Sequence, residues 1–454
     1  MKSSILIIAA AACVSSCSGG AGADFAPRAV CEVPQSGPEA ARQAFFFAFP
    51  LYEMSRMRQR MLAAPGAEIN SLRHRSALST PADRYITTPN NDTLYSAAWL
   101  DLSAGPVRFS IPAMGTRYHS VELMDMFSDA FEILRNESSG TRHFLIAGPD
   151  WKGRAGPGET LVRSPTRDAW LVARTYVDGT KDLIEAQRLQ MAYTLKPAHP
   201  LPAEEDFAAE IPDKPGSVQF LTVVNTALAR GPAPKVHGER LACFSAAGIT
   251  PGKSGSAAAP EPAMLQVWAD NIEIFYTEAR LAFETSGITR NGWQYPRPNI
   301  AVFGTDDVYR SAMALGGLAA LPVEEAINPM TSRDADGRTL SGTSGYTLRI
   351  PGNVPVDGFW SLTLYETDGD GRWFLYDNVL DRYAVNSTTP DLVKEDDGAI
   401  VLEISHREPA QPANWLPAPE GDYRLVFRAY RPHREFLDGT FLLPPAEKIA
   451  DPLP

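Results

Sequence analysis

Residues 88–100 read TPNNDTLYSAAWL and join a polar turn to an apolar run, the pattern that decides the fold. Short polar side chains readily bond neighbouring backbone groups, so Asn90, Asn91 and Asp92 are expected to build a tight turn before a strand at Leu94–Leu100. Further short runs rich in β-branched or aromatic residues follow at Val107–Ile111, Tyr118–Met126, His143–Ile146 and Ala169–Tyr176. Because Gly, Pro or Asn bound such runs, they predict an antiparallel β-sandwich.

The rest of the chain is expected to change from helical to β patterns. A helix is predicted at Pro38–Ala64, where apolar residues are spaced for one buried face and Pro50 is expected to bend or divide it. The helical pattern recurs in Leu183–Leu195, Val218–Arg230, Met264–Thr285 and Asp306–Ala320. Strand patterns return in Tyr346–Ile350, Gly358–Tyr365, Trp373–Tyr376, Ile400–Ser405 and Tyr423–Tyr430.

These segments predict an α+β protein in which two antiparallel β-sandwich or jelly-roll-like domains are joined by a helical region. We expect an N-terminal helix plus β-sandwich at residues 37–180, a helical linker region at 181–325 and a jelly-roll-like β domain at 326–454. A chain of 454 residues is long enough for several domains of ordinary size, each with a real core.

The start of the chain has the parts of a bacterial secretory signal. Lys2 precedes an apolar run at Ile5–Val14 that is too short to span a membrane. Because Val14-Ser15-Ser16-Cys17 resembles a lipobox, we predict a lipoprotein signal peptide at residues 1–16 and lipidation of Cys17.

Residues 17–36 are then expected to form a flexible tether behind the lipid anchor, which would attach the protein to a membrane. Ser18 favours the periplasmic side of the outer membrane over the inner membrane. Cleavage near Ala21-Gly22-Ala23 is the alternative and would give a soluble periplasmic protein. Either route predicts an exported protein.

The net charge bears on the kind of partner the protein can bind, and the cysteine content bears on disulfide formation. The chain has 42 Lys+Arg against 54 Asp+Glu and a net charge of -12, which argues against nucleic-acid binding because phosphate contacts need clustered basic residues. Cys31 and Cys243 remain beyond the signal and lipid site, and an oxidising periplasm permits them to form a disulfide. Two buried free thiols are the alternative, and the oligomeric state is left open.

The quoted stretch also resembles a family signature. Residues 88–96 with 99–102 and 105–106, continued by Arg117-Tyr118, residues 123–126, 163–166 and 174–175, are similar to the domain of unknown function 1254. Downstream, residues 359–363 with Tyr365, 377–378 with 382–383, and 414–419 resemble its companion, the domain of unknown function 1214. Arg428, Tyr430, Pro432 and residues 438–439 extend this resemblance. The resemblance implies a small β-sandwich, a helical segment and a jelly-roll-like domain in an exported protein. It implies no catalytic residues.

Three residues are candidates for catalysis. Asp92 would accept hydrogen bonds or hold a cation if it is functional, although a structural role in the turn is the leading interpretation. On Tyr118–Met126 a period of two places His119 and Asp125 on the apolar face. They are expected to form either a buried polar pair or an acid–base couple. The opposite face carries Tyr118, Ser120 and Glu122.

Candidate ligand-binding residues are the amide, aromatic and arginine side chains of the two resembling regions. Arginine supplies a bidentate fork and tryptophan a stacking face, which suits a cleft for a sugar or a carboxylate. Packing in the core is the alternative, above all for tryptophan. The candidates are Asn90, Asn91, Tyr95, Arg382, Tyr383, Trp415 and Arg428.

No metal site and no cofactor are predicted. The turns Asp334–Gly337 and Asp368–Gly371 have the spacing that begins a calcium loop, but each has arginine at the fifth position and lacks the glutamate required at the twelfth. Both are interpreted as hairpin turns, with a weak calcium site as the alternative. The seven histidines show no helical ligand spacing.

Two functional hypotheses follow. The first is an exported lipoprotein that binds a small polar or glycan-like ligand, or an envelope protein, where the two β domains meet. The second is a carboxylate-based hydrolase, with or without a metal ion, that uses Asp92 and Asp125. An enzyme should gather titratable groups in one concave site, whereas a binding protein need not.

Overall fold

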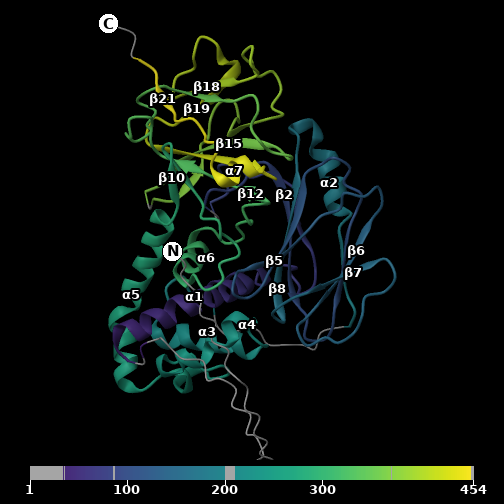
Figure 1. Ribbon diagram of the computed structural model, residues 1–454, viewed down its shortest axis with the longest axis vertical. Helices are drawn as coiled ribbons and strands as arrows, with labels where there is room; N and C mark the ends of the chain where they lie inside the picture. Colours follow the sequence, from purple (N-terminus) through teal and green to yellow (C-terminus); the bar gives the residue numbers. More distant parts are fainter. Residues whose placement is uncertain (1–33, 35, 85–86, 200–209, 370, 451–454) are drawn as a thin grey trace, which may run out of the picture.

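The computed structural model describes residues 34, 36–84, 87–199, 210–369 and 371–450. It combines several helices with mainly antiparallel sheets, as the sequence predicted, while the sandwich and jelly-roll descriptions of those sheets stay predictions. Figure 1 shows the C-terminal strands at the top, most of the helices below them and the N-terminal strands to the right. The predicted signal peptide, the lipidation site Cys17 and Cys31 lie outside the described residues.

One long helix, α1 (Gly37–Leu62), forms the centre of a helical layer. Pro38 fits its first turn, where no backbone donor is required, and Pro50 lies inside the helix without dividing it. Residues 44–52 are buried because α1 is covered by other helices and by the N-terminal sheet. Its helical neighbours are α3 (Ser217–Ala229), α5 (Pro262–Thr285) and α6 (Asp307–Gly316).

Two sheets make up the N-terminal β region, which spans residues 73–197. The first has the order β1 (Arg73–Arg75), β2 (Thr93–Asp101), β8 (Asp168–Tyr176), β4 (His119–Met124) and β5 (Ala130–Leu134). The second has the order β7 (Glu159–Arg163), β6 (Arg142–Ala147), β3 (Val107–Ile111) and β9 (Thr194–Pro197). Leu100 and Leu171 of the first sheet share a core with Phe109 and Ile146 of the second.

The other face of the first sheet meets the helical layer. Trp99 and Trp170 are a cross-strand pair on β2 and β8 with ring centroids 5.4 Å apart, and both belong to the core that contains α1. This sheet is therefore covered on both faces. Side chains near the start of β2 and the end of β8 extend beyond the helices and meet the C-terminal strands.

The C-terminal β region spans residues 288–448. Its larger sheet has the order β10 (Ile288–Arg290), β11 (Trp293–Tyr295), β13 (Met330–Thr331), β20 (Tyr423–Tyr430), β15 (Trp360–Thr367) and β16 (Trp373–Leu375), with β12 (Ala326–Ile327) on β20 and β17 (Ala384–Asn386) on β15. The smaller sheet has the order β19 (Trp415–Pro417), β18 (Ile400–Ser405), β14 (Tyr346–Ile350) and β21 (Glu447–Lys448). Leu362 and Leu402 belong to the core that the two sheets share.

Shorter elements complete the described chain. They are α2 (Leu183–Met191), α4 (Lys235–Gly238), α7 (Arg434–Asp438) and the 3-10 helices η1 (Thr180–Asp182), η2 (Leu241–Ala247), η3 (Gly255–Ala258) and η4 (Pro412–Asn414). Cys243 in η2 is buried and disulfide-bonded, and its predicted pairing with Cys31 stays a prediction because Cys31 lies outside the described residues. In the described part of the chain, every helix is too short or too polar to cross a membrane.

The ring of Phe45 tests how much the helical layer contributes to stability. Phe45→Ala is expected to lower the free energy of unfolding by about 3–5 kcal/mol, because it leaves a cavity among Phe49, Phe220 and Phe275. Urea unfolding measures the change. Ile274→Ala on α5, where 56% of the side chain is accessible, is the control and should stay within about 0.5 kcal/mol of the unchanged protein. Equal losses in both variants would contradict the assignment.

Candidate functional site

The polar turn at residues 88–92 contacts the C-terminal β region through several hydrogen bonds. Asp92 lies directly before β2 and is buried, and its Oδ2 accepts hydrogen bonds from Ser361 Oγ at 2.6 Å and Tyr430 OH at 3.3 Å. Asn90 binds Asp92 and Tyr430. Its Oδ1 accepts a hydrogen bond from the Asp92 amide, and its Nδ2 donates to Tyr430 OH at 2.7 Å. Burial raises the pKa of Asp92 above its ordinary value, although nearby Arg428 opposes the shift.

Arg428 on β20 joins the same turn from the other side. Its guanidinium donates to Tyr365 OH at 2.6 Å, to Thr363 Oγ1 at 2.9 Å and to the Thr88 carbonyl at 3.3 Å. Tyr365 OH in turn donates to the Pro89 carbonyl at 2.8 Å. Burial disfavours the charge of Arg428, yet the facing tyrosines and Asp92 hold its pKa above the ordinary value. These contacts and those of Asp92 are called the junction network below.

A cleft of about 800 Å³ lies beside the junction network. The β3–β4 loop, the end of β5 and residues 176–189 of the N-terminal β region line it on one side, and residues 357–359, 388 and 431 line it on the other. Tyr118, Tyr176 and Phe359 supply its aromatic surface. Because Phe359 stacks on Tyr430 with centroids 4.2 Å apart, these rings connect the cleft to the partners of Asp92.

Four arginines line the cleft, and two of them are bound by a neighbouring carboxylate through two nitrogens. Arg117 binds Asp182 through both terminal nitrogens and also donates to the Tyr176 carbonyl. Arg188 binds the exposed Glu185 through two nitrogens, at 2.6 and 2.8 Å. The other two arginines, Arg135 and Arg431, lie on the side of the cleft where the β regions meet.

His119 lines the cleft but does not pair with Asp125. Its Nε2 accepts from the Asn136 amide at 2.8 Å, so its Nδ1 carries the proton and donates to the Arg117 carbonyl at 3.0 Å. Burial lowers the pKa of His119. The imidazole therefore holds two backbone segments together, and the expected His119–Asp125 pair is not formed.

Asp125 follows the end of β4, where the register shifts between Leu123 and Met124. Its Oδ1 accepts the amides of Phe127 and Asp129 and closes the turn before β5. Burial and the charge of Asp129 raise the pKa of Asp125 to about 7. Asp92 and Asp125 lie beyond opposite ends of the first sheet, level with Val177 and Ala169 of β8, and so are roughly 26 Å apart at about 3.3 Å per strand residue. Asp125 does not line the cleft.

The other predicted ligand-binding residues lie away from the cleft. Tyr95 faces the guanidinium of Arg174 at 5.5 Å, and Asn91 donates to the Ser79 carbonyl within the N-terminal β region. In the C-terminal β region the predicted residues bind local groups: Arg382 the Trp415 carbonyl at 2.9 Å, Tyr383 the Asp381 carboxylate at 2.9 Å and Trp415 the Ser405 carbonyl at 2.9 Å.

The structure thus brings together Asn90, Asp92 and Arg428 of the predicted residues and places His119 in the cleft. The site also contains four residues that were not predicted from the sequence: Arg117, Tyr118, Tyr176 and Phe359. Arg117-Tyr118 and Phe359 do lie within the motifs that carried the family resemblance, which was the available signal. No sequence feature indicated that Arg135 and Arg431 line the same cleft, because only the tertiary structure brings them there.

Both Asp-x-Asp-Gly segments are closed by their own backbone. Asp334 Oδ1 accepts the amides of Asp336 and Arg338, and Asp368 Oδ1 accepts the amide of Arg372. Asp370 lies outside the described residues. Within the described chain, no group of three or more His, Cys, Asp or Glu residues is arranged to hold a metal ion.

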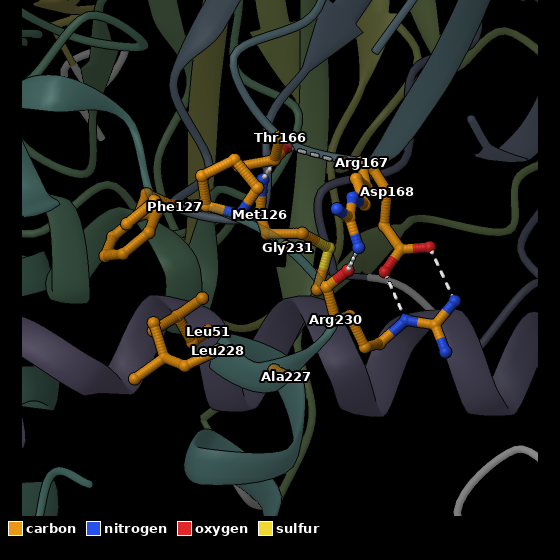
Figure 2. A pocket seen from close by; sticks show the side chains of 12 residues that line it. Leu51, Met126, Phe127, Thr166, Arg167, Asp168, Ala227, Leu228, Arg230 and Gly231 are labelled. Carbon is orange, nitrogen blue, oxygen red and sulfur yellow. Dashed lines mark hydrogen bonds and ion pairs between the residues drawn. The ribbon is translucent and has the colours of Figure 1, made fainter. Parts of the chain in front are cut away.

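A second, much smaller cavity lies between α1, α3 and the loop before β8 (Figure 2). Its volume of about 20 Å³ is enough for a single water molecule. Arg230 closes one side by binding both oxygens of Asp168, and Leu51 and Leu228 form an apolar side. A ligand larger than water does not fit there.

Two family models match the chain. The model described as Protein of unknown function (DUF1254) matches residues 69–197, and the model described as Protein of unknown function (DUF1214) matches residues 325–434. Every residue that lines the 800 Å³ cleft falls within one of these two ranges. No curated protein matches the sequence.

Two solved structures resemble the chain. The crystal structure of the VPA0106 protein from Vibrio parahaemolyticus has a TM-score of 0.71 at 20% identity, and the match covers 91% of this chain and 100% of that chain. The crystal structure of an uncharacterised protein from Burkholderia cenocepacia has a TM-score of 0.47 at 12% identity, covering 88% and 87% of the two chains. The likeness to the VPA0106 protein shows the fold alone.

Removal of Arg428 tests the junction network. Arg428→Leu is expected to lower the free energy of unfolding by about 3–5 kcal/mol, because Asp92 then stays buried without its nearest positive charge. Urea unfolding measures the loss. Arg382→Leu, which removes bonds to backbone carbonyls only, should cost about 1 kcal/mol. The double variant Asp92→Asn/Arg428→Leu should lose less stability than the single variants Asp92→Asn and Arg428→Leu lose together. A loss equal to that sum would contradict the coupling of the two residues.

The raised pKa of Asp125 predicts a pH dependence of stability. The carboxyl titrates near 3.8 in the unfolded chain and near 7 in the folded chain, so folding favours its protonated form. Its contribution is fully present below pH 3.8 and is lost as the pH rises through 7, with a slope of up to about 1.4 kcal/mol per pH unit.

Asp125→Asn keeps the acceptor for the Phe127 and Asp129 amides and removes the titration. Urea unfolding of both proteins between pH 4 and 8 isolates the effect as the difference between their curves. The charged and titratable neighbours Asp129, Arg310 and His237 stay in place in both. Parallel curves would show that Asp125 is ionised throughout.

Proposed function

We propose that this chain, which belongs to the family in which DUF1254 precedes DUF1214, is a non-catalytic binding protein that holds a small polar or glycan-like ligand in the cleft between its β regions. The observation that carries the proposal is the cleft itself. Its volume of about 800 Å³ lies in the range of about 300–1,000 Å³ typical of small-molecule sites.

The lining supports a polar ligand. Arginines, carboxylates and the Thr388 hydroxyl offer donors and acceptors around the aromatic surface of Tyr118, Tyr176 and Phe359. Sugars are commonly held by this combination, because an aromatic face packs on the ring carbons while charged side chains bind the hydroxyls.

The alternative, a carboxylate-based hydrolase, has less support. Its two carboxylates lie roughly 26 Å apart, beyond opposite ends of one sheet, and share no cleft, whereas paired catalytic carboxylates lie within about 10 Å of each other. Asp92 is also engaged by Ser361 and Tyr430 and does not line the cleft. The geometry therefore favours binding over hydrolysis.

The proposal places the protein in the bacterial envelope. The lipobox-like Cys17 supports an exported lipoprotein on the periplasmic side of the outer membrane, and the ligand would be a component of that compartment or part of an envelope protein. The shared core of the two N-terminal sheets supports the predicted β-sandwich, and the C-terminal sheets would form its jelly-roll-like companion.

A variant that fills the cleft tests the proposal. Thr116→Trp places a large ring in the β3–β4 loop, and Thr343→Trp makes the same change at an exposed turn far from the cleft. Mono- and disaccharides, amino sugars and small dicarboxylates would be screened against the full chain by thermal unfolding and calorimetry. A ligand of the cleft should bind the unchanged protein and Thr343→Trp alike and bind Thr116→Trp at least tenfold more weakly. Equal binding to all three would place the ligand elsewhere and overturn the proposal.

A further inference from the structure

Arg431 occupies a backbone position that suits glycine better than arginine. It follows β20 with φ 53°, in the left-handed region that glycine adopts freely and other L-residues rarely adopt. Its conformation is fixed from both sides, because its amide donates to the Glu325 carbonyl at 2.8 Å and its carbonyl accepts from the Asp357 amide at 2.9 Å. The side chain is thereby held at the mouth of the cleft.

Arg135 faces the same part of the cleft from the N-terminal β region. Its carboxylate partner is the buried Glu325, whose Oε1 also accepts from Tyr118 OH at 2.7 Å. The Nε of Arg135 is buried without a hydrogen-bond partner. Glu325 connects the two arginines, because its carboxylate pairs with Arg135 and its carbonyl accepts the Arg431 amide at 2.8 Å. Burial lowers the pKa of Arg135, and the positive charge of Arg431 adds a smaller contribution in the same direction.

The charge of this arginine pair is incompletely balanced. Arg431 lies 3.3 Å from Glu137, whose side chain is 65% accessible, and such an exposed contact is weak because water screens it. Arg117 and Arg188 differ, since each is bound by a neighbouring carboxylate through two nitrogens. The two guanidinium groups therefore share one buried carboxylate, Glu325, while the other two carboxylates near Arg431, Glu137 and Asp357, are exposed.

We propose that Arg135 and Arg431 form an oxyanion subsite that binds a carboxylate or phosphate group of the ligand in the cleft. This inference rests on the proposed function and specifies its ligand as an acidic sugar or a similar anionic small molecule. Two guanidinium forks match the oxygens of either group, because each presents parallel N–H donors. Tyr118 and Phe359 border the subsite and would contact the uncharged body of the ligand.

Four probes separate the contribution of the sugar ring from that of the anionic group: glucose, glucuronate, glucose 6-phosphate and inorganic phosphate. Calorimetry on the full chain at low salt is expected to show that at least one of the two anionic sugars binds ten times or more tightly than glucose. Whether glucuronate or glucose 6-phosphate is preferred identifies the group as carboxylate or phosphate. Raising the salt concentration should weaken the anionic probes and leave glucose unchanged.

Three variants locate the effect. Arg431→Gly suits the left-handed backbone and removes the side chain, so the fold is expected to be at least as stable while the preference for the anionic sugar disappears. Arg135→Gln should reduce the same preference at least tenfold. Arg188→Gln is the control, because it removes an exposed cleft arginine that is not part of the proposed subsite, and it should retain the preference.

The outcomes separate this inference from the proposed function. If Thr116→Trp weakens glucose and the anionic sugars equally and none is preferred, the cleft binds ligands and the oxyanion subsite is wrong. If the preference persists in Arg431→Gly and Arg135→Gln, the anion binds elsewhere and the subsite is also wrong. If no probe responds to Thr116→Trp, both the subsite and the proposed function for sugar-sized ligands are overturned.

Discussion

The contact between the two β regions depends on a carboxylate that is buried away from water. An ion transferred from water to a protein interior loses several kcal/mol of solvation, which only well-placed partners restore. Asp92 recovers part of this energy from Ser361 and Tyr430, both of which belong to the C-terminal β region. Arg428 in turn binds the Thr88 carbonyl of the N-terminal β region. Each region therefore supplies the groups that the other needs, and the polar turn before β2 is an interface as well as a turn.

The local sequence pattern was sufficient to predict many of the strands. The strands Val107–Ile111, Tyr346–Ile350, Ile400–Ser405 and Tyr423–Tyr430 begin and end where their patterns do, because each alternates between two environments and is bounded by turn residues. Strands β7 and β9 were missed because they are largely exposed edge strands, for which hydrophobic pattern carries little information. Strands β10 and β11 lie inside the segment expected to be helical, and only pairing with β13 identifies them.

The candidate site was less predictable because it depends on distance across the chain. The alternation on β4 was predicted correctly, since Val121 and Leu123 enter the shared core while Glu122 faces Arg174. Asp125 was misplaced because the strand ends at Met124, and a period of two loses its meaning beyond a strand end. Asn90, Asp92 and Arg428 were selected for separate reasons, and no local pattern indicates that Asn90 bonds to Tyr430 or that Arg428 bonds to the Thr88 carbonyl. Nor could sequence place Arg382 and Trp415 against nearby carbonyls.

The cleft takes its walls from both β regions, so its shape is a function of the angle between them. A ligand that fits one angle stabilises that arrangement over its neighbours, in proportion to its differential affinity. The relation is reciprocal: any force or partner that changes the angle changes the affinity of the cleft by the same free energy. The polar turn at Asn90 and Asp92, which lies directly before β2 and bonds to the C-terminal β region, holds the two regions at one such angle.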